Sequence, residues 1–312
     1  AGTSWLDCGA REWSPDLLSK SGMRQDQVPD LFEGSAPIGN LRSELAERWG
    51  VGRNVIVVGG GGDNAAAACG VGALREGDAF VSLGTSGVLL AAKDSFAPMP
   101  TSAVHTFCHA VPNRWYQMGV ILAATDSLNW LSQILDADAA DLAGIVGTSI
   151  NGPNDMQFLP YLSGERTPHN DSAIRGAMLN IDIASTRGDM VQAVMEGVSF
   201  ALRDNLEALK LTGTNLSRAL GIGGGAQSPF WVELVATVLD MPIDLPEKGE
   251  FGAALGAARL AIVGKTGRTP QTVMTPPKVA KTILPRSELT AKYQLAYERY
   301  KMTYPASVSY TH

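Results

Sequence analysis

Three apolar runs in this chain each end at a glycine-rich turn, and this pattern constrains the fold more than any other feature. The first run, Asn54–Val58, leads into Gly59–Gly62 and then into Asp63, Asn64 and an alanine-rich stretch. The pattern predicts a buried strand that breaks sharply before a helix, where a ligand can approach the backbone closely. Asp63 is therefore our first candidate for a reacting group. The alternative for an aspartate after glycines is a turn residue or a helix cap.

The second junction joins two predicted strands. Asp78–Leu83 and Val88–Ala92 are apolar and are separated by Gly84–Gly87, which reads Gly-Thr-Ser-Gly. The glycines allow positive φ, and the hydroxyls and amides of such a turn can converge on an anion. The turn is therefore a candidate phosphate cradle, and an ordinary hairpin turn is the alternative.

The third junction precedes a helix. Arg218–Ile222 is a predicted strand, Gly223–Gly225 follows it, and Ser228 with Pro229 supplies an N-cap and a first-turn proline. Glycines before a helix would let a nucleotide lie against the backbone, with the positive end of the helix toward its phosphates. None of the junctions has the G-x-G-x-x-G dinucleotide pattern with an acidic residue about 20 positions later, and the G-x-x-x-x-G-K-[ST] loop is also absent from the sequence.

The order of these and other motifs carries a resemblance to a known family. The motifs are Gly60–Ala66, Ser82–Gly87, His105–His109, Phe158–His169, Glu196–Arg203 and Gly223–Ser228. Over essentially the whole chain they resemble the C-terminal portion of xylulokinases, within the carbohydrate kinase family that also includes glycerol, gluconate and ribulose kinases. The resemblance implies an α/β fold of the actin-like ATPase, ribonuclease H-like type. In that fold two domains flank a cleft that holds sugar on one side and ATP on the other.

The resemblance also implies roles for particular residues. Asp63 is implied as the general base that takes the proton from the sugar hydroxyl and as a metal contact through water, and Asn64 as a sugar contact. The residues implied beside the transferring phosphates are Gly84, Thr85 and Ser86, and those beside the adenosine are Gly224, Gly225 and Ala226. Phosphoryl transfer needs alignment and charge neutralisation more than a covalent intermediate. Mg²⁺ keeps several of its waters, so few protein ligands are expected.

The activity implied is a transferase reaction, the ATP-dependent phosphorylation of D-xylulose to D-xylulose 5-phosphate, with Mg²⁺. Two alternatives stay open from the sequence. One is a kinase of the same family for another ketose or polyol. The other is a truncated, non-catalytic nucleotide- or sugar-binding module.

The chain departs from the family at its beginning. Complete members open with a strand that ends in an Asp-x-Gly-Thr turn, which we do not find in this sequence. Residues 1–52 instead resemble the closing part of the N-terminal sugar-binding domain, and residues 53–312 the C-terminal ATP-binding kinase domain. We therefore expect that this chain by itself does not form the complete cleft.

Composition excludes some classes of function. A net charge of −6 argues against a nucleic-acid partner, because binding a polyanion depends on clustered Lys and Arg. No apolar run reaches the about 20 residues that cross a membrane, and no secretory signal pattern is present, so the cytoplasm is the expected location. Exposed Trp and Leu side chains in the first segment suggest a homodimer. The three cysteines, Cys8, Cys69 and Cys108, are expected to be reduced.

Other segments give coarser expectations. Thr186 and Asp189 predict the cap of a long helix, on which Glu196 is interpreted as a solvated or packing-edge carboxylate. Residues 265–285 are expected to form a loop or an extended connection. Residues 289–300 are expected to form a helix that packs through Tyr293, Leu295, Ala296 and Tyr300, and residues 304–312 to be irregular.

Two motifs have competing interpretations. His105, Cys108 and His109 lie close enough in the sequence to suggest zinc, but no second ligand pair is suitably spaced, and packing is the favoured interpretation. Ser163–Pro168 is interpreted as a loop that lines the cleft, with a surface turn as the alternative, and no role is assigned to it.

Overall fold

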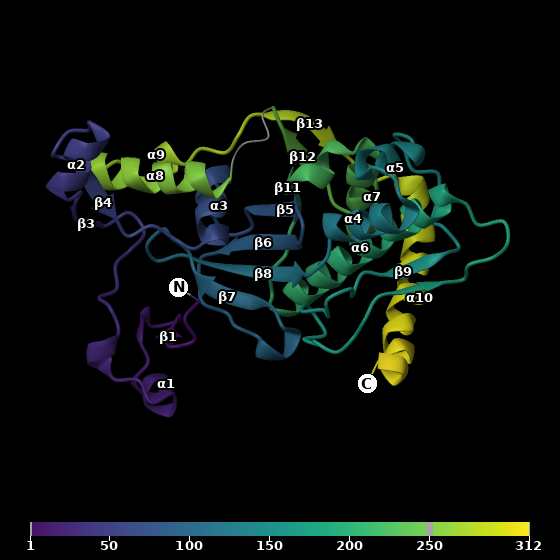
Figure 1. Ribbon diagram of the computed structural model, residues 1–312, viewed down its shortest axis with the longest axis horizontal. Helices are drawn as coiled ribbons and strands as arrows, with labels where there is room; N and C mark the ends of the chain where they lie inside the picture. The colour runs from purple at the N-terminus through teal and green to yellow at the C-terminus, as the bar shows by residue number, and fades with distance from the viewer. Residues whose placement is uncertain (1, 248–251, 312) are drawn as a thin grey trace.

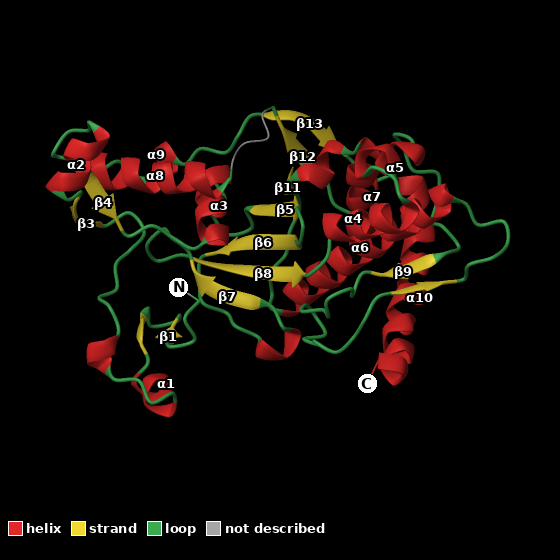
Figure 2. Ribbon diagram, viewed as in Figure 1, coloured by secondary structure: helices red, strands yellow, loops and turns green. Residues whose placement is uncertain are grey.

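A seven-stranded mixed sheet forms the centre of the molecule (Figures 1 and 2). The computed structural model describes residues 2–247 and 252–311. The strands follow one another across the sheet in the order β13 (Val279–Ile283), β12 (Ile243–Pro246), β11 (Ala219–Ile222), β5 (Ala79–Leu83), β6 (Gly87–Lys93), β8 (Trp115–Ile121) and β7 (His105–Cys108).

Strand pairing brings two of the glycine junctions to one edge of this sheet. β5 and β6 are antiparallel neighbours, as the sequence predicted, and Leu83 pairs with Gly87 at their turn. β11 runs parallel to β5, and Ile222 pairs with Ser82. Because parallel strands end at the same edge, the turns after Leu83 and after Ile222 lie next to each other.

Alternate side chains of the strands enter two separate cores. On one face Val81, Leu83 and Leu89 pack with apolar residues of five helices. These helices are α4 (Thr125–Leu135), α5 (Ala139–Ile145), α6 (Arg187–Leu211), α7 (Pro229–Leu239) and α10 (Ser287–Thr311). Thr186 and Asp189 form the predicted capping box at the start of α6. The hairpin β9 (Gln157–Leu159) and β10 (Ala177–Leu179) lies beside the same helices.

The other face is covered by two helices with small side chains. α3 (Asp63–Val71) and α8 (Ala253–Thr266) pack over Phe80, Val88 and Leu90. A Cβ on Gly256 would lie 1.7 Å from the carbonyl oxygen of Ala66, so glycine is required where the two helices cross.

The first part of the chain projects away from the sheet and has little core of its own (Figure 1). Its elements are β1 (Leu6–Asp7), β2 (Glu12–Trp13), α1 (Pro15–Lys20), the 3₁₀ turn η1 (Gln25–Gln27), β3 (Pro37–Asn40), α2 (Ser43–Trp49) and β4 (Ile56–Val58). Arg11 links this region to the sheet, because its guanidinium donates to the carbonyl of Arg114 (2.9 Å) and pairs with Glu33.

The interpretation of Glu196 as a solvated or edge carboxylate was wrong. Its side chain is 2% exposed, and its carboxylate accepts the backbone N–H of Asn154 and the amide of Gln192. The hydroxyl of Tyr293 on α10 also lies against it. Because α10 covers this part of α6, an apparently outer carboxylate becomes an internal hydrogen-bond acceptor.

The expectations for the end of the chain were partly wrong. Residues 265–285 contain α9 (Pro270–Val273) and β13, which pairs antiparallel with β12. Helix α10 continues to Thr311, so residues 304–311 are regular, and His312 lies outside the described residues. The hydroxyl of Tyr304 donates to Asp171, and its ring stacks on His169 with centroids 3.6 Å apart. Leu295 does not pack, because it is 69% exposed.

No helix within residues 2–247 and 252–311 combines the length and the apolar character that crossing a membrane requires. All three cysteines are free thiols, as expected.

Candidate functional site

The turn between β5 and β6 is held from behind by the start of α4. The carbonyl oxygen of Gly84 accepts the N–H (2.9 Å) and the hydroxyl (2.8 Å) of Thr125, and that of Thr85 accepts the N–H of Ala124 (2.8 Å). Thr85 and Ser86 are exposed on the open side of the turn. The positive end of α4 is therefore close to a turn with exposed hydroxyl groups, which favours an anion there.

The turn after β11 packs directly on this first turn. Gly223 has φ +91°, and a Cβ there would lie 2.7 Å from the carbonyl group of Leu83. A Cβ on Gly225 would lie 2.8 Å from Cβ of Leu83 and 3.2 Å from Cγ2 of Thr125. Gly224, in the 3₁₀ turn η3 (Gly224–Gln227), has open space around it. The structure therefore brings together the residues expected near the phosphates and those expected near adenosine.

Two cavities flank the second turn. One of about 550 Å³ extends between α4, α5 and the start of α7. Its lining includes Leu128, Asn129, Ala143, Gly225, Gln227 and Trp231. The other, of about 480 Å³, lies between the glycine turn and the end of β12 and is bordered by Ala226. An apolar pocket with a few amide groups beside a candidate phosphate turn suits a nucleobase and its sugar.

Asp63 lies outside these two cavities. It is the first residue of α3, it is exposed, and its Oδ1 accepts the N–H (2.7 Å) and the side-chain amide (3.3 Å) of Asn64. Burial and then the charge of Asp63 raise the pKa of Tyr116 on β8. Within the described ranges, no hydrogen bond joins Asp63 to either glycine turn.

The glycines before Asp63 border a third cavity, of about 390 Å³. Arg11, Glu33 and His109 also line it. His109 is buried: Nδ1 accepts the N–H of Val111, and Nε2 lies 3.1 Å from the carbonyl oxygen of Ala73. Burial lowers the pKa of His109 to about 4, so the imidazole is neutral at pH 7.

The part of the chain that the structure describes contains no group of three or more His, Cys, Asp or Glu side chains that could hold a metal ion. The zinc alternative therefore has no support among the described residues. Asp63, Thr85 and Ser86 expose oxygen atoms, the kind of ligand that Mg²⁺ prefers, and magnesium binding stays a prediction.

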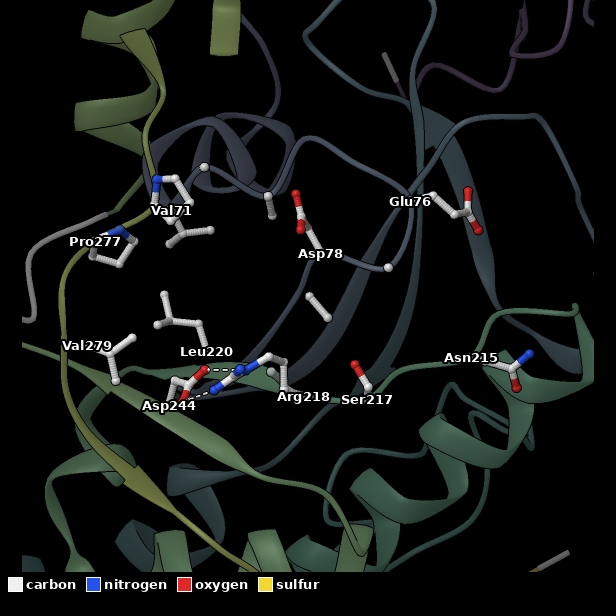
Figure 3. A pocket seen from close by; sticks show the side chains of 16 residues that line it. Val71, Glu76, Asp78, Asn215, Ser217, Arg218, Leu220, Asp244, Pro277 and Val279 are labelled. Carbon is white, nitrogen blue, oxygen red and sulfur yellow. Dashed lines mark hydrogen bonds and ion pairs between the residues drawn. The ribbon is translucent and has the colours of Figure 1, made fainter. Parts of the chain in front are cut away.

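A further cavity, of about 470 Å³, lies at the opposite, amino-terminal ends of β5 and β11 (Figure 3). Arg218 and Asp244 lie side by side on one wall of it, in a two-point ion pair with distances of 2.7 and 2.9 Å (Figure 3). Thr282 donates to the same carboxylate, so the pair joins β11, β12 and β13. These groups satisfy one another, and we assign this cavity to the structure of the sheet.

Sequence reasoning missed the groups that support the nucleotide cavities. It did not identify α4, whose residues Ala124 and Thr125 hold the first turn, nor the contribution of Trp231. A signal for α4 was present in the apolar spacing of Leu128 and Leu131 after Thr125, whereas no local pattern indicates that Trp231 lines a cavity.

Family models of known proteins match two parts of the chain. The model of the C-terminal domain of the FGGY family of carbohydrate kinases matches residues 79–264, more than half of the chain. The chain belongs to the FGGY family of carbohydrate kinases. The model of the family's N-terminal domain matches residues 1–70. The boundary predicted at residue 52 stays a prediction.

Individual FGGY kinases resemble this chain over nearly its whole length. Xylulose kinase of Escherichia coli (strain K12) is 38% identical over 306 residues, which are 97% of this chain and 63% of that protein. The crystal structure of a xyloylose kinase from Brucella ovis has a TM-score of 0.94 and 52% identity, covering 98% of this chain and 63% of that one. This FGGY chain thus spans less than two thirds of the length of these relatives.

The structural neighbours also establish the fold class. Plasmodium falciparum glycerol kinase with ADP has a TM-score of 0.84 at 18% identity, which shows a shared fold. The FGGY chain therefore has the α/β, actin-like ATPase fold that the sequence predicted.

Proposed function

We propose that this chain contributes the nucleotide-binding part of an ATP-dependent sugar kinase that converts D-xylulose to D-xylulose 5-phosphate. The observation that carries the proposal is the packing of the turn at Gly223–Gly225 against the turn at Gly84–Ser86. Relatives named xylulose kinases favour D-xylulose over another ketose or polyol. A cytoplasmic location and a homodimer stay predictions.

In this proposal the two turns divide the nucleotide between them. Gly84, Thr85 and Ser86 face the transferring phosphates, where the exposed hydroxyls and backbone amides stabilise negative charge. Gly224, Gly225 and Ala226 lie against the adenosine, and the apolar cavity beside Leu128 and Trp231 receives the base. Bound magnesium would neutralise charge on the phosphates as the phosphoryl group moves.

Asp63 is proposed as the general base. Its carboxylate would accept the proton of the sugar hydroxyl as that oxygen bonds to the γ-phosphorus and the bond from that phosphorus to ADP breaks. Asn64 donates to Asp63 and so keeps the carboxylate oriented, and its own amide is available to the sugar. Because Asp63 is exposed here, the proposal requires a sugar-bearing surface to close over it and exclude water.

A non-catalytic binding module is the second candidate, because Asp63 is open to solvent. Calorimetry with ADP and a coupled assay of D-xylulose-dependent ADP formation separate the candidates. For the kinase we expect Asp63→Asn to lower turnover about 100-fold or more while the Kd for ADP changes less than about twofold.

Asp16→Asn is the matched control, because Asp16 is also an exposed aspartate in the first turn of a helix. It should change neither quantity. Failure of the wild-type chain to bind ADP would contradict both the kinase and a nucleotide-binding module. ADP binding without any turnover would favour the binding module.

A further inference from the structure

Two residues of the segment Ser163–Pro168 make hydrogen bonds to the backbone at the end of β8. β7 pairs with β8 only as far as Met118, whereas β8 continues to Ile121. Thr167 takes the next position: its N–H donates to the carbonyl of Val120, and its Oγ1 accepts the N–H of Val120, each at 3.1 Å. Thr167 therefore lies against the end of β8, while Ser163 and Arg166 of the same segment are exposed.

Glu165 makes the corresponding contact two residues after Val120, at Leu122, which directly follows β8. Its Oε1 accepts the N–H of Leu122 at 3.2 Å and that of Arg166 at 2.7 Å. The backbone of Glu165 is held by a pair of 2.8 Å hydrogen bonds with Asp171. The carboxyl group thus supplies the hydrogen-bond acceptor that a neighbouring strand would otherwise supply where β8 ends.

The burial of this carboxyl group calls for an explanation. Glu165 is 2% exposed, and its Oε2 has no hydrogen-bond partner in the part of the chain that the structure describes. Burial raises the pKa of Glu165 to about 8. A buried carboxyl group with one unpaired oxygen is costly, and an apolar residue would fill the same space at lower cost.

The backbone at Leu122, whose N–H Glu165 accepts, continues directly to residues that contact the turn Gly84–Ser86, which we call the phosphate turn. Leu122 is followed by Ala123, Ala124 and Thr125, and the last two donate their N–H groups to the carbonyls of Thr85 and Gly84. A displacement of the Leu122 backbone would therefore also displace Ala124 and Thr125, and with them the turn that is proposed to face the phosphates.

We propose that Glu165 is a positioning residue, which fixes the phosphate turn Gly84–Ser86 by holding the N–H of Leu122. The inference rests on the proposed nucleotide site and assigns Glu165 to one part of it. Glu165 supports the binding of the phosphates, and it does not support the binding of the nucleoside.

Calorimetry with two probes tests this division. The probes are AMPPNP with Mg²⁺, which carries all three phosphate positions, and adenosine, which carries none. Glu165→Met fills the space but removes the acceptor of the Leu122 N–H, so we expect the affinity for AMPPNP to fall about tenfold. The affinity for adenosine should change less than about twofold. Glu165→Gln keeps an acceptor oxygen and should restore AMPPNP binding to within about threefold of wild type.

Glu196→Met is the matched control. Glu196 has the same 2% exposure and also accepts a backbone N–H, that of Asn154, but it lies on α6 and has no contact with residues 122–125 among its hydrogen bonds. It should leave the ratio of the two affinities unchanged. The inference would be overturned if Glu165→Met lowered the affinities for AMPPNP and for adenosine by the same factor. It would also be overturned if Glu196→Met changed the ratio of the two affinities as much as Glu165→Met does.

Hydrogen exchange of the wild-type chain keeps the inference testable if Glu165→Met does not fold. AMPPNP should slow exchange of the amides of residues 120–124, which lie before the proposed adenosine cavity, and adenosine should not. The same protection by both ligands, or by neither, would overturn the positioning role. Failure of wild type to bind either ligand would instead contradict the proposed function.

Discussion

Two regions of this chain are built in different ways. From β5 onward, the sheet and its helices enclose large apolar side chains, among them Trp231, Tyr161 and Phe158, which are at most 1% exposed. Among residues 2–62, the only apolar side chains that are buried are Leu18 and Ala46. The large apolar side chains exposed there are Leu17, Leu31, Phe32, Ile38, Trp49, Val51, Val55 and Val57.

The difference shows where the stability of the chain resides. The sheet region supplies its own core, so substitutions inside it should cost the full free energy of lost packing. The first region leaves its apolar side chains in water, so the same substitutions should cost little. Its attachment includes polar contacts such as those of Arg11 with the carbonyl of Arg114 and of the Trp115 ring N–H with the carbonyl of Cys8.

The largest effect is expected from Trp231→Ala. Trp231 is 1% exposed and lines the proposed base cavity, so its removal should lower the free energy of unfolding by about 4 kcal/mol, as measured by urea denaturation. Trp231→Phe is the control and should cost clearly less, because Nε1 of Trp231 has no hydrogen-bond partner within the described residues. Equal costs for the two variants would contradict the packing argument.

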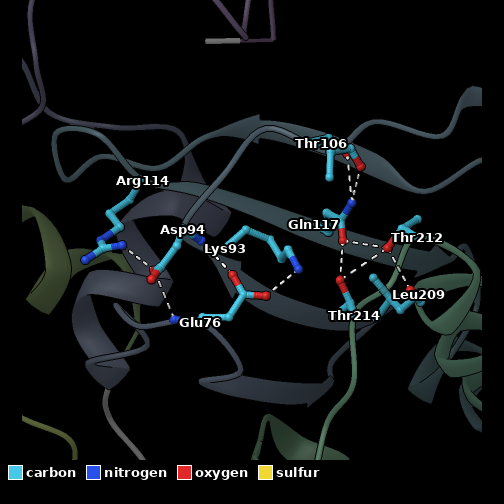
Figure 4. A network of polar contacts seen from close by, with 10 residues as sticks. Glu76, Lys93, Asp94, Thr106, Arg114, Gln117, Leu209, Thr212 and Thr214 are labelled. Carbon is cyan, nitrogen blue, oxygen red and sulfur yellow. Dashed lines mark hydrogen bonds and ion pairs between the residues drawn. The ribbon is translucent and has the colours of Figure 1, made fainter.

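Gln117→Leu should give the next largest effect. The buried amide of Gln117 joins β8 to the end of α6, since its Oε1 accepts the hydroxyls of Thr212 (2.8 Å) and Thr214 (2.6 Å) (Figure 4). Its Nε2 donates to the carbonyl of Ala97. Removal of the amide takes the Gln117 partner from Thr214 and from the carbonyl of Ala97, whereas Thr212 still reaches the carbonyl of Leu209 (2.7 Å). The substitution should therefore cost about 2 kcal/mol in urea denaturation.

A double-mutant cycle provides the control for this cluster. Thr214→Val in the Gln117→Leu background should cost less than Thr214→Val in wild type, because the hydroxyl has already lost its acceptor. Additive costs would show that the two side chains do not depend on each other. The neighbouring ion pairs, Lys93 with Glu76 and Arg114 with Asp94, should be unaffected (Figure 4).

A smaller effect that depends on pH is expected from Glu196→Gln. Burial raises the pKa of Glu196 from 4.5 to about 7, so the folded state holds this proton more tightly than the unfolded state does. The resulting stability is complete below about pH 4.5 and is lost as the pH rises through about 7.

Glutamine stays neutral, so the variant should become more stable relative to wild type between pH 5 and pH 8, by about 1 to 3 kcal/mol. Chemical denaturation at several pH values measures this change. A difference that does not vary with pH would contradict the assignment.

The smallest effect is expected from Trp49→Ala in the first region. Trp49 ends α2 and is 60% exposed, so the free energy of unfolding should change by less than about 0.5 kcal/mol. The comparison with Trp231→Ala is direct, because the residue type and the substitution are the same. A cost near that of Trp231→Ala would show that the first region has a packed core.

The sequence predicted the elements whose signals are local. Gly84–Gly87, Ser228 with Pro229, and Thr186 with Asp189 each specify a turn or a cap within a few residues, and the structure agrees. The predicted exposures of Glu196 and Leu295 were wrong because they depend on how α10 packs against α6, which no local pattern indicates. The tight packing of Gly223 on Leu83 depends on the pairing of β5 with β11, which are more than 130 residues apart in the sequence, so no local pattern could indicate it.

The most direct test of a single nucleotide site made by two touching turns is calorimetry of ADP with Gly223→Ala. The new Cβ would lie 2.7 Å from the carbonyl group of Leu83, so it must separate the turns. Gly213→Ala is the control, because Gly213 has a similar φ of +83° but nothing within 4 Å of the added atom. The account predicts that wild type and Gly213→Ala bind ADP and that Gly223→Ala, still folded by circular dichroism, binds it at least about tenfold more weakly. Unchanged ADP affinity in folded Gly223→Ala would contradict it.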